Sequence, residues 1–224
     1  MSQEPLTPDQ FRNATYLDFE GEGATQNHVN KKPHLAGLFS PSEKGNSGRY
    51  ECVFFKEAWK PVSNGINQAK HIDFDSFFDD LANRLKEADA YLVFWSIHES
   101  DVLKELLPTD IFFKLEPRLY NLLPLARRYI NRREILGEED SVRGKSLEDY
   151  FELIYPNRSP FPPFPLGAAK ACRQTDKACE AHRKWQQFSD KQKSDARGLV
   201  KYNEGDCRST WLIAKRIGNY FSSQ

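Results

Sequence analysis

The sequence lacks any long apolar segment and any excess of charge of one sign. No hydrophobic run approaches the ~20 residues of a membrane-spanning helix. The polar start MSQEPLTPDQF has neither the basic nor the apolar region of a signal peptide. Lysine plus arginine equals aspartate plus glutamate at 32 each, so any electrostatic binding surface must be local. We therefore expect a cytoplasmic protein that does not use a membrane.

Cysteine is also scarce. In a chain without a secretion signal, Cys52, Cys172, Cys179 and Cys207 indicate reduced thiols rather than a disulfide framework. The last three, together with His182, could be assembled on paper into a zinc site. The tight Cys-x2-4-Cys knuckle of structural zinc sites is missing, however. We therefore interpret these residues as ordinary helix and core positions.

Hydrophobic residues are present in the amount that a folded domain needs. They make up 39% of the 224 residues and include sixteen phenylalanines. A chain of this size can bury one core, so we predict a single domain over 1–224, or one domain that carries an insertion. The highly charged region 170–195 is either a solvated helical pair or a mobile flap. We mark 156–198 as a candidate helical insertion or lid.

The first half of the chain alternates between strand and helix patterns. Short apolar runs at 14–19, 34–39 and 50–55 are separated by turn residues, which is typical of adjacent strands. Apolar residues then recur every three or four positions over 72–90, behind helix-start aspartates, and predict an amphipathic helix. The run AYLVFW at 90–95 is apolar on both faces, as expected of a buried central strand.

The second half is mostly helical in its pattern. We predict a helix at 99–107, followed by a short apolar stretch at 118–120 that leads into 122–130, and a later helix at 146–154. A proline-rich passage at 158–167 cannot be regular structure, and the remainder has a helical composition. The order of elements predicts a single α/β domain with an antiparallel opening and a helical C-terminal third.

Two acids of the first predicted strand share one face. Asp18 and Glu20 are two residues apart, so their side chains lie about 7 Å apart on the side opposite Leu17 and Phe19. Two carboxylates on one face of a core strand repel each other unless a cation neutralises them. The alternative is that the strand ends at Leu17 and that both acids are solvated turn residues.

A second pair lies near the end of the chain. In KYNEGDCRSTWLIAKRI, Tyr202 and Asp206 are four residues apart and would project from one side of a helix. The alternative is that Tyr202 is a core aromatic and Asp206 a capping residue, with Gly205 marking the start of a helix.

Three short motifs in this order resemble a known family. YLDFEGEG in the first strand, VFWSIHES after the central strand and YNEGD in the late helix resemble the DEDD superfamily of 3′–5′ exonucleases. The likeness is closest to its tyrosine-bearing branch and to the predicted exonucleases of the ribonuclease-H-like superfamily 2 domain. It covers most of 14–217, and NLLPLARRYI at 121–130 looks like the family's short fifth strand and following helix. It implies an α/β, ribonuclease H-like fold: a mixed five-stranded sheet, its first three strands antiparallel, flanked by helices, with a helical C-terminal third.

The resemblance also implies roles for individual residues. Asp18 would bridge two metal ions, Glu20 and Asp206 would complete the coordination of the first, and Tyr202 would orient or deprotonate the attacking water. Lys201 stands where the histidine-bearing branch has its histidine, which excludes that branch. The second motif departs from the family, because counting back from the apolar helix positions places Glu99 where an aspartate is usual. Asp101 is the runner-up for this metal-binding position.

The residue types suit the chemistry that the resemblance implies. Mg²⁺ or Mn²⁺ prefers oxygen ligands and keeps several waters, so three or four carboxylates suffice to hold two such ions. Two ions neutralise charge on both the attacking and the leaving oxygen of a phosphodiester. Tyrosine, with a reference pKa of about 10, is a poor base near neutral pH, so Tyr202 would chiefly position the water.

Residues that could hold a nucleic acid lie later in the chain. Basic side chains between the fifth strand and the helix at 146–154 could contact phosphates, and Trp95 or a phenylalanine of 158–167 could stack a terminal base. The alternative is that at least half of these basic residues form a solvated helix face. The basic candidates are Arg127, Arg128, Arg132, Arg133, Arg143 and Lys145.

We therefore expect a two-metal-dependent 3′–5′ exonuclease that hydrolyses single-stranded DNA or RNA ends. The alternative is a catalytically weak or inactive ribonuclease H-like module that binds nucleic acid or a partner protein, which Glu99 and the neutral net charge favour. A third reading is an unrelated α/β scaffold whose acids lie on the surface. The sequence carries no signal for an oligomeric state.

Overall fold

The centre of the protein is a mixed β-sheet. The computed structural model describes the chain apart from residues 1–3, 22–31, 43–46, 134, 136–145 and 159–163. In the described part the sheet has six strands in the order β4-β3-β2-β1-β5-β6. The strands are β1 (Thr15–Glu20), β2 (Leu35–Pro41), β3 (Gly48–Phe54), β4 (Ala69–His71), β5 (Leu92–Phe94) and β6 (Leu119–Asn121).

Strand directions give the sheet its ribonuclease H-like topology. The pairs β1–β2 and β2–β3 are antiparallel, whereas β5 runs parallel to β1 and β6 runs parallel to β5. The prediction of an α/β, ribonuclease H-like sheet that opens with three antiparallel strands is confirmed. The predicted number of five strands misses β4, which pairs in parallel with β3. This strand is only three residues long, and its sequence AKH has no apolar pattern to reveal it.

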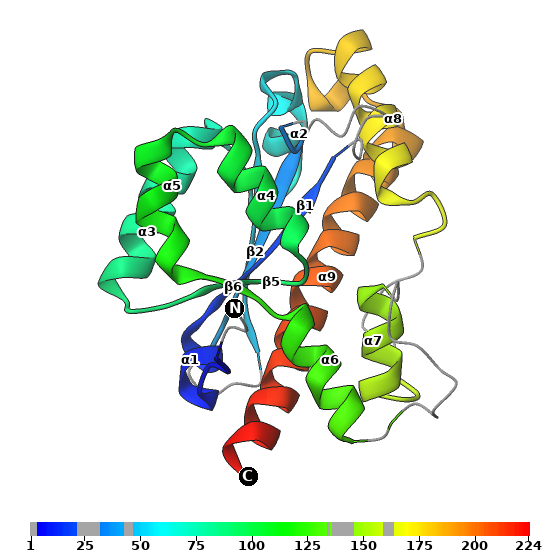
Figure 1. The fold of residues 1–224 in the computed structure, drawn as a ribbon. Coiled ribbons are helices and arrows are strands. Elements are labelled where there is room, and N and C mark those ends of the chain that lie inside the picture. Colours follow the sequence, from blue (N-terminus) through cyan, green and yellow to red (C-terminus); the bar gives the residue numbers. More distant parts are fainter. Residues whose placement is uncertain (1–3, 22–31, 43–46, 134, 136–145, 159–163) are drawn as a thin grey trace.

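Helices cover both faces of the sheet (Figure 1). One face carries α3 (Phe74–Glu87), α4 (Ile97–Leu106) and α5 (Thr109–Leu115). The other face carries α1 (Pro8–Asn13), α6 (Leu123–Arg132), α7 (Leu147–Ile154), α8 (Ala168–Ala181) and α9 (Asp190–Ser222). The short α2 (Lys60–Gly65) packs beside β3 and β4. Three single-turn 3₁₀ helices in the described part are η1 (Glu57–Trp59), η2 (Glu116–Arg118) and η3 (Trp185–Gln187).

Alternation along β1 divides the core between the two helical layers. Leu17 packs with the phenylalanines of α3, while Tyr16 packs on the opposite face among residues of α1 and α9. The three residues of β5 are buried on both faces, which explains why this strand has no polar position. Asp18 and Glu20 follow the parity of Tyr16, so the α9 side of the sheet receives both acids.

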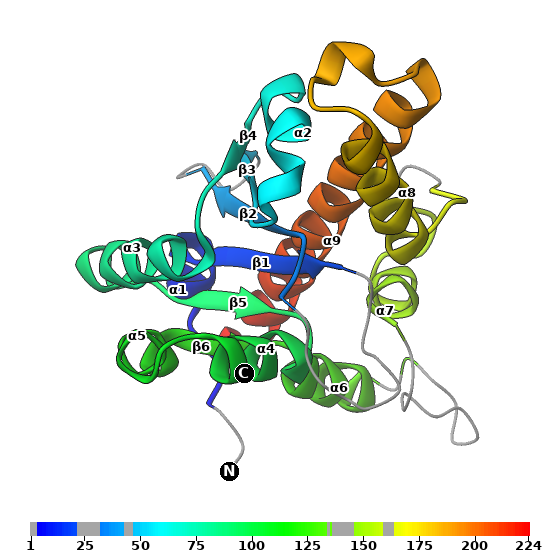
Figure 2. The ribbon, with the colours of Figure 1, turned by 90° about the horizontal axis from the view of Figure 1, so that it is seen from above.

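The last helix is long and unbroken. It begins at a capping box formed by Ser189 and Gln192 and runs through Ser222 (Figure 2). Figure 2 shows it beside β1, with α8 packed against it. Gly205 lies buried inside this helix rather than at its start. The alternative reading of Asp206 as a capping residue is therefore wrong.

Most predicted elements appear with boundaries shifted by a few residues. The predicted strands at 14–19, 34–39 and 50–55 are β1, β2 and β3, and the helix predicted over 72–90 is α3. The charged region 170–195 contributes to two packed helices, α8 and α9. The helices α1, α2 and α5 were not predicted. Within the described residues, no helix combines the length and the apolar character that crossing a bilayer requires.

The cysteines occupy core positions, as interpreted from the sequence. All four are buried free thiols. Burial raises the pKa of Cys52 and of Cys179 to about 12, so both stay protonated. The Cys207 thiol donates to the backbone oxygen of Gly37 at 3.4 Å, which places α9 directly on β2.

Candidate metal centre

Three carboxylates from distant parts of the chain meet at one end of β1. Asp18 and Glu20 come from the strand, and Asp206 comes from the middle of α9. One oxygen from each residue lies within 4.8 Å of an oxygen of the other two. These three residues form the candidate metal centre. Strand parity brings the first two acids together, and the packing of α9 across β1 and β2 adds the third.

The centre is buried and strongly acidic. Glu20 and Asp206 are only 7% and 8% exposed. Burial, followed by repulsion from neighbouring acids, raises the pKa of Asp18 and of Glu20 well above the ordinary value. Burial and the nearby acids Glu148 and Glu99 raise the pKa of Asp206 to about 8. Without a cation, the centre therefore holds protons near neutral pH.

The donor set fits a hard divalent cation. Oxygen atoms alone make up the three-carboxylate group, which suits Mg²⁺ or Mn²⁺ and offers no sulfur or imidazole ligand. The Oε1 atom of Glu20 is buried and has no hydrogen-bond partner among the described residues. An unpaired buried carboxylate oxygen is costly, so the chain itself leaves one coordination position to be filled.

One residue at the centre was missed by sequence reasoning. Asn203 is 0% exposed, and its Nδ2 donates to the Asp18 carboxylate at 2.6 Å. Its Oδ1 accepts a hydrogen bond from the hydroxyl of Tyr50 at 2.8 Å. Its position in the helix was the one signal in the sequence that could have revealed it. An amide three residues before Asp206, and four after Leu199, falls within the buried stripe of the helix.

The acid of the second motif lies close to the centre but outside the three-carboxylate group. Glu99 is 6% exposed, at the third position of α4, and accepts hydrogen bonds from the backbone and the hydroxyl of Ser96 at 3.2 and 3.0 Å. Its charge contributes to the raised pKa of Asp18, Glu20 and Asp206. Asp101 is exposed. Burial and proximity therefore favour Glu99 over Asp101 for the position in the second motif.

Tyr202 lies next to Asp206 of the centre. Its ring packs on Phe164 at 5.6 Å, and its hydroxyl donates to Glu148 at 3.4 Å. Burial, together with repulsion from Asp206 and Glu148, raises the pKa of this phenol. The phenol therefore keeps its proton at neutral pH. Glu148 is a further acid that the sequence did not single out, because an exposed acid in the first turn of a helix resembles any other.

Of the six predicted basic residues, two lie far from the centre and two lie outside the described residues. The guanidinium groups of Arg132 and Arg133 lie over the rings of Phe221 and Tyr220, at the end of α9. Fourteen helical residues separate Tyr220 from Asp206, or roughly 20 Å along the axis. These two arginines therefore do not contact a phosphate held at the centre. The candidates Arg143 and Lys145 lie outside the described residues.

The two aromatic candidates for base stacking differ in accessibility. Trp95 is 9% exposed and packs edge to face on Tyr150 at 5.0 Å, so its ring belongs to the core. Phe164, from the proline-rich passage, is only half-buried and packs beside Tyr202. Of these two side chains, Phe164 is the one placed to meet a ligand at the centre.

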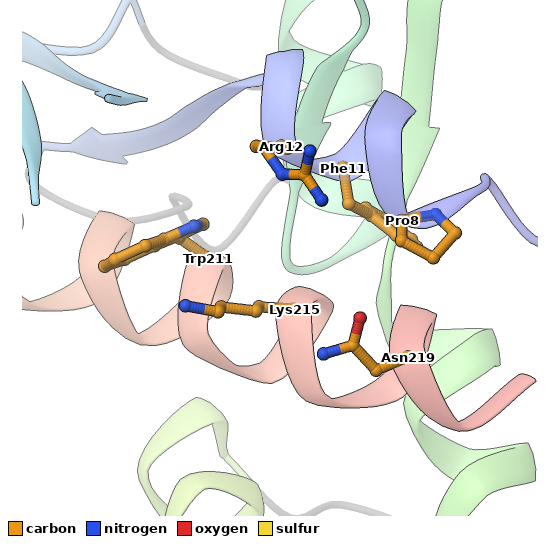
Figure 3. A pocket seen from close by; sticks show the side chains of 6 residues that line it. All are labelled: Pro8, Phe11, Arg12, Trp211, Lys215 and Asn219. Atoms are coloured by element: carbon orange, nitrogen blue, oxygen red, sulfur yellow. The ribbon is translucent and has the colours of Figure 1, made fainter. Parts of the chain in front are cut away.

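A separate hollow lies between α1 and α9 (Figure 3). The described residues that line it include two bases, Arg12 and Lys215, but no carboxylate. Arg12 pairs with Asp9 at 3.0 Å, and the ammonium of Lys215 lies 5.6 Å from the centre of the Trp211 ring. The described lining therefore offers no carboxylate to a divalent cation, and the three-carboxylate centre remains the candidate functional site.

Comparisons with models of protein families, with curated proteins and with solved structures give no match to this chain. Function must therefore be argued from the fold and the centre. These two observations are a ribonuclease H-like sheet and a buried acidic cluster that could hold a metal ion.

Proposed function

We propose that this chain is a metal-dependent 3′–5′ exonuclease that hydrolyses phosphodiester bonds at single-stranded DNA or RNA ends. The observation that carries the proposal is the convergence of Asp18, Glu20 and Asp206 around a buried, unpaired oxygen of Glu20. The sequence resemblance to the tyrosine-bearing DEDD exonucleases supplies the direction of digestion and the substrate class. The ribonuclease H-like strand order supports that resemblance.

In this proposal the three carboxylates hold two Mg²⁺ or Mn²⁺ ions, with Glu99 as a further ligand. Such ions, when bound, neutralise negative charge on the attacking and leaving oxygens of a phosphodiester. Tyr202 keeps its phenolic proton because burial raises its pKa, so it orients the attacking water through a hydrogen bond instead of removing a proton. Phe164, beside this tyrosine, supplies a ring edge against which the terminal base packs.

The test is digestion of a 5′-labelled single-stranded oligonucleotide with Mg²⁺ or Mn²⁺. We expect stepwise shortening by the wild type and no shortening by Asp18→Asn. The matched control is Asp110→Asn, because Asp110 is an exposed acid in the first turn of α5. A wild type that shortens neither DNA nor RNA with either metal would refute the exonuclease proposal. Equal activity in Asp18→Asn would point to a different site.

One observation favours a second candidate, a catalytically weak ribonuclease H-like module that binds nucleic acid. The capping box with Ser96 holds the Oε2 atom of Glu99, so this oxygen must give up hydrogen bonds before it can bind a metal ion. In that case the protein would slow the migration of oligonucleotides in a gel-shift assay with Mg²⁺ but would not shorten them. The same wild-type preparation therefore distinguishes the two candidates.

The segment 156–198 stays a predicted insertion or lid. Its helix α8 is tied to the segment that follows β3 through Asp176, whose carboxylate accepts hydrogen bonds from Lys56 at 2.6 Å and Trp59 at 2.7 Å. His34 lies 3.1 Å from the same carboxylate. Burial acts to raise the pKa of Asp176, but the hydrogen bonds from Lys56 and Trp59 lower it below its ordinary value. These contacts favour a fixed wall over a moving lid.

A further inference from the structure

We infer that Asn203, held by Tyr50, is a positioning residue that fixes the Asp18 carboxylate for metal binding. The inference rests on the proposed metal-dependent function and adds to it a device outside the carboxylates themselves. Asn203 contacts Asp18 twice, because its Nδ2 lies 2.6 Å from Oδ2 and 3.3 Å from the backbone oxygen. Asn203 thus links both the side chain and the backbone of Asp18 to α9.

The direction of the hydrogen bonds is set by chemistry. A carboxylate that binds a metal ion is ionised and only accepts, so in the metal-bound state the amide must present its NH₂ group to Asp18. The amide oxygen then faces Tyr50, whose hydroxyl donates to it at 2.8 Å. Burial raises the pKa of Tyr50 well above its ordinary value, which keeps the hydroxyl a donor. The relay from Tyr50 through Asn203 to Asp18 therefore has one consistent orientation.

The sheet leaves space for this relay at one position. Gly37 of β2 stands directly opposite Asp18 of β1. A Cβ atom at Gly37 would lie 1.6 Å from Oδ1 of Asn203 and 2.9 Å from the Tyr50 ring. The amide thus occupies the volume that any other side chain at this position would fill. Asn203 of α9 contacts Asp18 of β1, Tyr50 of β3 holds the amide, and Gly37 of β2 leaves room for it.

Asp18 needs such a partner because its other neighbours repel it. Asp206 and Glu20 both act on its carboxylate with like charge. Asp18 is only half-buried, so burial alone does not fix the position of its side chain. A ligand that must be reoriented loses rotamer freedom on binding, and outer groups that orient ligands typically contribute about 10–100-fold in metal affinity.

The experiment compares Mn²⁺ binding to folded wild type and variants, measured from the electron paramagnetic resonance signal of free Mn²⁺. Asn203→Leu keeps the side-chain volume but removes the amide, and Tyr50→Phe removes only the outer hydrogen bond. The matched control is Tyr16→Phe, because Tyr16 is another buried tyrosine, whose hydroxyl donates to the backbone of Phe11 at 2.7 Å.

We expect the Mn²⁺ dissociation constant to rise by about 10–100-fold in Asn203→Leu, by less in Tyr50→Phe, and not at all in Tyr16→Phe. Nuclease activity of Asn203→Leu should recover at high Mn²⁺, because the catalytic groups remain. A purely structural role would lower the melting temperature of the variants without changing the Mn²⁺ affinity of the folded fraction, and that result would overturn the inference.

Tyr50→Phe keeps the test decisive if Asn203→Leu does not fold. Wild-type Mn²⁺ affinity in this conservative variant would then overturn the relay. If the wild type itself binds no Mn²⁺, the proposed function fails and the inference fails with it. If the wild type binds Mn²⁺ and the folded variants bind it equally well, the inference alone fails.

Discussion

Removing divalent cations should leave the folded chain with a stability that falls as pH rises, and Asp206→Asn should abolish much of that fall. The pKa of Asp206 is about 8 in the folded protein, against an ordinary value of 3.8. The unfolded chain therefore releases this proton several pH units before the folded chain does. Between the two values the unfolded state binds fewer protons, so increasing pH favours unfolding.

The magnitude follows from the width of this window. Each pH unit between the unfolded and the folded pKa costs about 1.4 kcal/mol of unfolding free energy. From pH 5 to pH 7, Asp206 alone should therefore cost about 3 kcal/mol, a large part of the 5–15 kcal/mol typical of a domain. The loss is absent below the unfolded pKa and levels off above pH 8. Asp18 and Glu20 act in the same direction, because their pKa values are raised too.

Urea unfolding, followed by circular dichroism at pH 5, 6, 7 and 8 in EDTA, measures the effect. Comparing wild type with Asp206→Asn cancels the contribution of groups that both proteins share. We expect the variant to be the more stable of the two at pH 7, and the difference to shrink toward pH 5. Adding Mn²⁺ at pH 7 should stabilise the wild type only. Parallel pH profiles, or a less stable variant at pH 7, would refute the reasoning.

Three further predictions test other parts of the structure. Gly37→Ala should lower both the melting temperature and the Mn²⁺ affinity, because the new Cβ displaces the Asn203 amide; unchanged affinity would contradict this. Glu99→Ala should reduce the nuclease rate and Mn²⁺ occupancy more than Asp101→Ala, and the reverse order would show that the second motif has another register. Asp176→Ala should lower the unfolding free energy by about 2–4 kcal/mol in urea titrations, because it leaves three donors around α8 without their acceptor; a loss below 1 kcal/mol would argue against the anchor.

The sheet could be predicted where burial imposes a period on the sequence. In β1, apolar and polar residues alternate because opposite faces meet different layers, and β5 is apolar throughout because both of its faces are buried. The strand β4 has only three residues, one of which is the exposed Lys70. Its place in the sheet depends on pairing with β3, which a local pattern does not encode.

The three acids of the centre could be found because their spacing carries geometric information. A separation of two residues in a strand places Asp18 and Glu20 on one face, and the family resemblance directed attention to Asp206. Asn203 could not be found in the same way. Its partners Asp18 and Tyr50 lie 185 and 153 residues away in sequence, so an uncharged amide inside an apolar stripe gives no sign of its role until the helix is placed on the sheet.

The chain itself offers a comparison that bears on the candidate metal centre. Asp176 is a buried acid, and the fold supplies it with Lys56, Trp59 and His34. Among the described residues, no lysine or arginine forms an ion pair with Asp18, Glu20 or Asp206. The only described hydrogen-bond donor to the Asp18 carboxylate is a neutral amide.

This difference is informative because leaving buried carboxylates unneutralised costs stability. A fold that needed these acids only for its own stability could neutralise them with a basic side chain, as it does at Asp176 with Lys56. A permanent cationic side chain would, however, compete with a metal ion for the same oxygens. A neutral donor such as Asn203 orients the Asp18 carboxylate while leaving its charge for a cation from solution. Asp176 has a cationic partner, whereas Asp18, Glu20 and Asp206 have none among the described residues. This contrast supports a metal-binding role for the three acids, as does the unpaired oxygen of Glu20.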